Sequence, residues 1–233
     1  MVRRIFYHIT VIGTQLESLN FIFVDGRFEI LGFPDAVKTI ALTRQEGKFL
    51  ADLALHQADL EFALNCLEGI NRHPTDAFIQ QALWRSAVTH FVKCFSSGAR
   101  RFLQPNQVLK GQPEVALWAF NYIKELRNKH LAHDDNSLSQ SISGAIINNG
   151  KKEFKIEKIF ALPIHAETLM AENYSNLKLL CDVVLTWVVN QFDLECDRIT
   201  AVLEKANHND LMRRSEPLFS IAKIEDIGIS RSA

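Results

Sequence analysis

Cysteine is scarce in this chain of 233 residues. The four cysteines, Cys66, Cys94, Cys181 and Cys196, are scattered, and none of them forms a Cys-x-x-Cys pair. In a chain of this length, such a distribution argues against a disulfide framework and is typical of reduced thiols in a cytosol. Cys66, Cys94 and Cys181 stand among apolar residues, so we expect these three in the core.

A hydrophobic run long enough to cross a membrane is also lacking. The most apolar later stretch, residues 177–189, contains Lys178 and Asp182 and is too short to span a bilayer. The N-terminus carries Arg3 and Arg4 like a signal peptide, but His8 interrupts the apolar run and no small-residue cleavage site follows. The sequence therefore predicts a soluble, cytoplasmic protein without a membrane partner.

Net charge is nearly absent, because 26 Lys and Arg are balanced by 27 Asp and Glu. A nucleic-acid-binding protein is usually strongly basic, so the overall charge does not predict one. Residues 85–133 differ from the rest, since they contain eight basic residues and only two acidic ones: Arg85, Lys93, Arg100, Arg101, Lys110, Lys124, Arg127 and Lys129 against Glu114 and Glu125. This local excess indicates a surface for RNA, although a solvated helix face explains the same charges.

Residues 1–45 are rich in the β-branched and aromatic residues that are typical of strands. Residues 5–12 predict one strand. Residues 21–24 and 27–31 predict two more, joined by Asp25 and Gly26, which form a two-residue turn of the kind that requires a positive φ. We expect this segment to pack on the helices, because an isolated hairpin is only marginally stable in water.

Helical periodicity dominates from Lys48 onward. The apolar spacing, together with breaks at Gly and Pro, predicts four helices: residues 48 to about 68, 77 to 95, 113 to 133, and 165 to 207. We interpret residues 46–210 as one helical domain, followed by a loosely ordered tail, 211–233.

A second hairpin is predicted between the third and fourth helices. Its strands would be residues 142–147 and 154–160, within an insertion at about 140–162 that Pro163 ends. The predicted fold class is therefore mainly α: a four-helix bundle with two appended β-hairpins, one N-terminal and one after the third helix.

The densest polar cluster in the sequence is Leu126-Arg-Asn-Lys-His-Leu-Ala-His-Asp-Asp135, at the predicted end of the third helix. On a continuing α-helix, Arg127 and His133 would lie ~120° apart at ~100° per residue, so they would not face each other. They form a site only if His133 lies past the helix end or if another element, or another copy of the chain, completes the site. The residue types suit RNA cleavage, because His exchanges protons near neutral pH and Arg holds a phosphate with two parallel donors.

Arg127-Asn128-x-x-x-x-His133 resembles the R-x(4–6)-H motif of the HEPN superfamily, with a polar residue after the arginine. The helical order of residues 48–207 is also similar to that of HEPN proteins, and the amino-acid sequence of the motif resembles that of abortive-infection-type members. The resemblance implies a homodimer that acts as a metal-independent endoribonuclease without a cofactor, in phage defence, a toxin–antitoxin pair or a stress response. In it, His133 would be the acid or base, Arg127 would stabilise the phosphorane and Asn128 would orient the groups. RNA would be held by Lys129, Lys124, Arg85, Arg100 and Arg101.

Three alternatives remain open at the level of sequence. The first is a non-catalytic dimeric helical module that binds RNA or a protein partner, such as an antitoxin. The second gives the motif a structural role only, with His133 favoured at a helix C-terminus by the helix dipole. The third is a metal site built from His130 and His133, which have helical i, i+3 spacing but no third ligand motif in the sequence.

Overall fold

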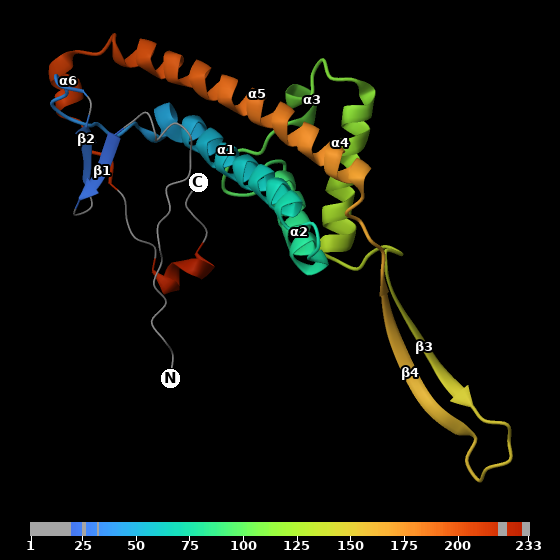
Figure 1. Cartoon of the computed structure of the whole chain (residues 1–233). Helices are drawn as coiled ribbons and strands as arrows, with labels where there is room; N and C mark the ends of the chain where they lie inside the picture. Colours follow the sequence, from blue (N-terminus) through green and yellow to red (C-terminus); the bar gives the residue numbers. More distant parts are fainter. Residues whose placement is uncertain (1–19, 25–26, 32, 219–222, 230–233) are drawn as a thin grey trace. The chain divides into compact units, whose positions relative to one another are not determined.

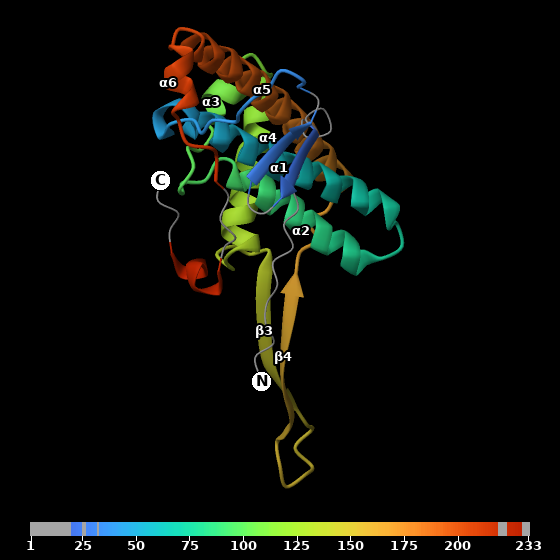
Figure 2. The same cartoon turned by 90° about the vertical axis from the view of Figure 1, so that its left-hand side faces the viewer.

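The computed structural model describes residues 20–24, 27–31, 33–218 and 223–229 and is mainly helical, as predicted (Figures 1 and 2). The strand expected at residues 5–12 lies outside these residues. Chain order gives the elements β1 (Asn20–Val24), β2 (Arg27–Leu31), α1 (Arg44–Arg72), α2 (Ala77–Lys93), α3 (Pro105–Val108), α4 (Glu114–Leu126), η2 (Arg127–Leu131), β3 (Ser139–Ile147), β4 (Ile156–His165), α5 (Ala171–Leu203), α6 (His208–Met212) and η3 (Ile224–Gly228). None of the described helices combines the length and apolarity that a membrane crossing needs.

The chain divides into two compact units. The first unit takes its described residues from Met1–Phe62, Lys93–Val108 and Asp182–Ala233. The second unit consists of Ala63–Val92 and Leu109–Cys181. Each unit has its own apolar core, and helices α1, α2 and α5 each contribute residues to both units.

Buried apolar residues at helical spacing form the core of the first unit. Leu53 and Leu60 of α1, and Val184 and Val188 of α5, are completely buried there. Helix α1 begins at Arg44, one turn before the predicted start, because Thr43 and Glu46 form a capping box. The Thr43 N–H donates to Glu46 Oε2 (2.8 Å), and the Glu46 N–H donates to Thr43 Oγ1 (3.3 Å).

The first residues after α6 are held by this unit, although the sequence predicted a loosely ordered tail. Arg214 donates to both carboxylate oxygens of Glu46, at 2.8 and 3.0 Å. Lys38 Nζ donates to the carbonyl oxygens of Met212 and Arg214, and the Ala41 N–H donates to the Ser215 carbonyl (2.7 Å). These bonds tie residues 212–215 to the segment around the start of α1.

The second unit is built around α2 and α4. Trp84, Val88 and Phe91 of α2 are completely buried, and Phe91 meets Phe120 of α4 edge to face with ring centroids 6.2 Å apart. The indole N–H of Trp84 donates to the buried Thr168 hydroxyl (3.1 Å), so this aromatic core leaves no unpaired donor at the tryptophan.

Strands β3 and β4 form a two-stranded antiparallel ribbon in the second unit (Figures 1 and 2). The prediction that Pro163 ends the second strand is wrong, because β4 continues through Pro163, paired with Ser141, to His165. In a two-stranded ribbon every strand is an edge, so a residue without an N–H is tolerated. Because β4 extends to His165, α5 begins only at Ala171. The helical spacing had predicted a start near His165.

Candidate functional site

The predicted motif lies at the end of α4, where the helix changes its hydrogen-bonding pattern. Residues Arg127–Leu131 form a π-helical segment, here called the π-turn. The Ala132 N–H donates to the Arg127 carbonyl, five residues earlier, at 2.9 Å. Such π-helical insertions are rare and are frequently found at functional sites. The α-helix predicted to reach His133 is therefore wrong in its last turn, and the angle of ~120° calculated for it does not apply.

A second backbone hydrogen bond closes a short loop just after the π-turn. The Asp135 N–H donates to the Lys129 carbonyl (2.9 Å), which confines His133 and Asp134 to a short loop. The Lys129 ammonium lies 3.5 Å from the Asp135 carboxylate, but both side chains are about half exposed, so this ion pair adds little stability. His133 thus lies past the helix end, in a loop whose two ends are hydrogen-bonded.

Arg127 and Asn128 are adjacent and partly buried, and Arg127 Nη1 donates to Asn128 Oδ1 (3.1 Å). Among the described residues, Arg127 makes no ion pair with a carboxylate, so its remaining donors are available to an anion. His133 is exposed. The motif therefore presents a guanidinium, a carboxamide and an imidazole within seven residues of chain.

The buried histidine of the motif is His130, which the sequence analysis did not select for a catalytic role. Its Nδ1 lies 3.3 Å from the Ser139 hydroxyl, which in turn lies 3.2 Å from Nδ1 of His165. Burial lowers the pKa of His130, and the positive charge of Arg85 lowers it further. His130 thus connects the π-turn to both strands at the base of the ribbon.

The other predicted RNA contacts fall into both units. Lys124, Lys129 and Arg85 are exposed residues of the second unit. Arg100 and Arg101 belong to the first unit. Arg101 is exposed, whereas Arg100 is only 10% exposed in its side chain and forms an ion pair of 2.5 Å with Asp59. Arg100 therefore has a structural partner that the sequence did not indicate.

The sequence contains a signal for one of the residues that were missed, His130, but none for Ser139 and His165. His130 follows buried Leu126 by four residues, so it continues the apolar face of α4 and its burial was accessible from spacing. Ser139 and His165 meet only because the strands pair in the observed register, which the sequence does not specify.

In the part of the chain that the structure describes, no group of three or more His, Cys, Asp or Glu side chains is arranged to hold a metal ion. The hypothesis of a metal site at His130 and His133 therefore gains no third ligand.

Comparisons with protein-family models, with curated proteins and with solved structures found no match for this chain.

Proposed function

We propose that the protein is a HEPN-type, metal-independent endoribonuclease with RNA as its substrate, acting through Arg127, Asn128 and His133. The observation that carries this proposal is the π-turn: it leaves Arg127 without a carboxylate partner among the described residues and places His133 in an exposed loop closed by Lys129 and Asp135. A guanidinium that no carboxylate neutralises and an accessible imidazole are the two groups that phosphodiester cleavage by this route requires.

The chemistry follows from the groups that RNA itself supplies. The ribose 2′-oxygen loses its proton to a base and attacks the neighbouring phosphorus, and the bond to the 5′-oxygen breaks as that oxygen receives a proton. The products carry a 2′,3′-cyclic phosphate and a 5′-hydroxyl. His133 exchanges one of these protons, the Arg127 guanidinium stabilises the charge that develops on the phosphorane oxygens, and Asn128 orients Arg127 through the hydrogen bond from Nη1.

A second copy of the chain would complete the site. Two proton transfers are needed at opposite sides of the phosphorus, and the motif of one chain exposes one histidine, His133. Pairing of two π-turns across a two-fold axis supplies the second His133 and a second Arg127, as the resemblance to HEPN proteins implies. Exposed Lys124, Lys129 and Arg85 of the same unit would hold the flanking phosphates. Arg100 is left out of this set because Asp59 holds its guanidinium.

The test is cleavage of labelled RNA in the presence of EDTA. His133→Ala should lower the rate by about 10²–10⁴-fold, and Arg127→Ala by about 10²–10³-fold. The matched control is His73→Ala, which removes another exposed histidine of the same unit and should cleave like the unaltered protein. Equal cleavage by all four proteins, or loss of cleavage on chelation, would contradict the proposal.

A second candidate is a non-catalytic dimeric helical module that binds RNA or a protein partner. It is favoured by the contact of buried His130 with Ser139, which gives part of the motif a structural role at the base of the ribbon. This candidate predicts RNA binding without cleavage products, or no effect on RNA at all, and His133→Ala should then change only the stability of the protein. The role in phage defence, a toxin–antitoxin pair or a stress response rests on the resemblance alone.

A further inference from the structure

Buried polar groups on α1 hold the chain segment that follows α2 in the first unit. Asp52 and His56 are 3% and 1% exposed, respectively, although they lie on a helix face whose other residues are largely apolar. Asp52 Oδ2 accepts the Arg101 N–H (3.0 Å), and His56 Nε2 lies 2.8 Å from the Arg101 carbonyl oxygen. Because a carbonyl only accepts, His56 carries its proton on Nε2. The backbone of Arg101 is thus fixed on both sides.

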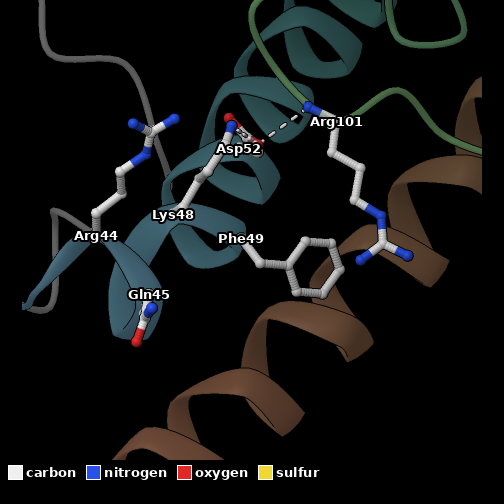
Figure 3. Close-up of a pocket in the computed structure, with 6 residues that line it drawn as sticks. All are labelled: Arg44, Gln45, Lys48, Phe49, Asp52 and Arg101. Atoms are coloured by element: carbon white, nitrogen blue, oxygen red, sulfur yellow. Dashed lines mark hydrogen bonds and ion pairs between the residues drawn. The ribbon is translucent and has the colours of Figure 1, made fainter. Parts of the chain in front are cut away.

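The side chain of Arg101 is positioned by this anchored backbone and by an aromatic ring. Its guanidinium carbon lies 5.0 Å from the centroid of the Phe49 ring, a cation–π contact (Figure 3). The guanidinium therefore lies over the phenyl ring. The guanidinium makes no ion pair within the part of the chain that the structure describes.

A pocket of about 450 Å³ lies beside this pair. It is lined by residues of the first two turns of α1 and by Arg101: Arg44, Gln45, Lys48, Phe49, Asp52 and Arg101 (Figure 3). Three of its side chains are cationic and one is a carboxylate, so the lining carries two positive charges in excess. The carboxylate of Asp52 forms an ion pair with Lys48 (3.3 Å), whose ammonium also donates to the Ala99 carbonyl (3.4 Å) and is about one-third exposed, so Arg44 and Arg101 are the cations of the lining without an ion pair among the described residues.

Arg44 and Lys48 are one helical turn apart, and their side chains run in the same direction along α1 (Figure 3). Arg44 makes no ion pair with any other described residue. The pocket therefore combines Arg44 and the Asp52-paired Lys48 on one helix face with a guanidinium in cation–π contact with a phenyl ring. Cations at this spacing suit a phosphate, and a guanidinium plane is a surface on which nucleic-acid bases stack.

We propose that this pocket binds a nucleotide phosphate, with Arg44 and Lys48 on the phosphate and the base stacked on the Arg101–Phe49 pair. The volume lies within the range of small-molecule sites. The phosphate belongs either to a free mononucleotide or to the 5′-phosphate end of an RNA. The site uses no residue of the π-turn and goes beyond the proposed cleavage activity.

The experiment measures binding by isothermal titration calorimetry to the full-length His133→Ala variant, so that cleavage does not interfere. The probes are adenosine monophosphate, adenosine, inorganic phosphate, and an eight-nucleotide RNA with either a 5′-phosphate or a 5′-hydroxyl. Adenosine monophosphate should bind more tightly than adenosine and than inorganic phosphate. Preference for the phosphorylated RNA over its 5′-hydroxyl form, without binding of the mononucleotide, identifies the RNA end as the ligand.

The variants separate the phosphate contact from the stacking contact. Arg44→Gln should weaken nucleotide binding about 10- to 100-fold, the range of a lost charge-assisted hydrogen bond. Arg72→Gln is the matched control, because it removes an equal charge from an exposed site in the second unit and should bind like the parent. Arg101→Gln should weaken binding of the mononucleotide more than that of inorganic phosphate.

Several results would overturn the proposal. They are no binding of any nucleotide probe at millimolar concentration, equal affinity for adenosine and its monophosphate, or equal losses in Arg44→Gln and Arg72→Gln. Tighter binding of a poly-glutamate peptide than of every nucleotide would also overturn it, because the pocket would then be an acidic-peptide site. These outcomes are independent of RNA cleavage, since the protein titrated already lacks His133.

Discussion

Removal of the Asp59 carboxylate should be among the most destabilising single changes in the first unit. The Asp59 side chain is 8% exposed and accepts hydrogen bonds from two cations: Lys93 Nζ at 3.0 Å and Arg100 Nη2 at 2.5 Å. The two cations are not equivalent. The Arg100 side chain is 10% exposed, whereas that of Lys93 is 55% exposed.

The magnitudes follow from this difference in exposure. Asp59→Ala leaves the Arg100 charge buried without its carboxylate, a situation that costs about 3–5 kcal/mol. Lys93→Ala removes an exposed partner and should cost about 0–1 kcal/mol. Because a folded domain is stable by only about 5–15 kcal/mol, Asp59→Ala should remove a large part of the total. Replacing both members of the buried pair, as in Asp59→Leu with Arg100→Leu, should recover much of the loss, since no buried charge then remains unpaired.

Urea unfolding followed by circular dichroism measures these free energies, and the three variants are compared with the unaltered protein. A loss in Asp59→Ala no larger than that in Lys93→Ala would refute the assignment of Arg100 as a buried partner. A double variant less stable than Asp59→Ala would refute the desolvation argument. Because Arg100 precedes Arg101, Asp59→Ala should also weaken nucleotide binding in the pocket beside Phe49.

Two further predictions concern other contacts. Hydrogen bonds from Arg214 lower the pKa of Glu46 to about 2, from an ordinary value of 4.5. The stability that the ionised Glu46 adds to the folded state is therefore complete above about pH 4.5 and is lost as the pH falls toward 2. The melting temperatures of Glu46→Gln and of the unaltered protein should differ at pH 7 and converge between pH 4.5 and 2. A difference in melting temperature that stays constant with pH would contradict this prediction. Thr168→Val leaves the buried Trp84 N–H unpaired and should cost about 1–3 kcal/mol in urea unfolding. The control, Thr186→Val, alters an exposed hydroxyl bonded within its own helix, and equal losses in the two variants would refute the prediction.

The helices could be predicted from the sequence because the buried residues of α1, α2, α4 and α5 follow helical spacing. The errors lie at the ends of helices and strands, where capping residues and strand pairing compete with hydrophobic periodicity. Helix α1 starts earlier than predicted because Thr43 and Glu46 cap it, a pattern that apolar spacing does not register. Strand β4 runs through Pro163 because no third strand pairs with it in the described residues. Neither feature is visible in hydrophobic periodicity.

The candidate site was accessible only in part. Arg127, Asn128 and His133 were singled out by residue type, and their proximity follows from the chain itself. The π-turn was not predictable, because a π-helix and an α-helix differ by one residue per hydrogen-bonded turn and share the same apolar pattern over so short a segment. The partner of Arg100 was missed because Asp59 lies on an apolar helix face 41 residues earlier.

The β3–β4 ribbon bears on how the protein avoids unwanted association. Along its strands, most side chains are exposed, including large apolar ones such as Ile142, Leu162 and Ile164. An open strand edge of this kind is a template on which a strand of another chain can be added. Pro163 has no N–H to offer to an added strand, and the register shift at Ile146 and Ile147 makes Glu157 an extra residue on the same strand, a bulge that increases the local twist. Both obstacles to strand addition therefore lie on β4, and they limit aggregation at that edge of a ribbon whose apolar side chains face water.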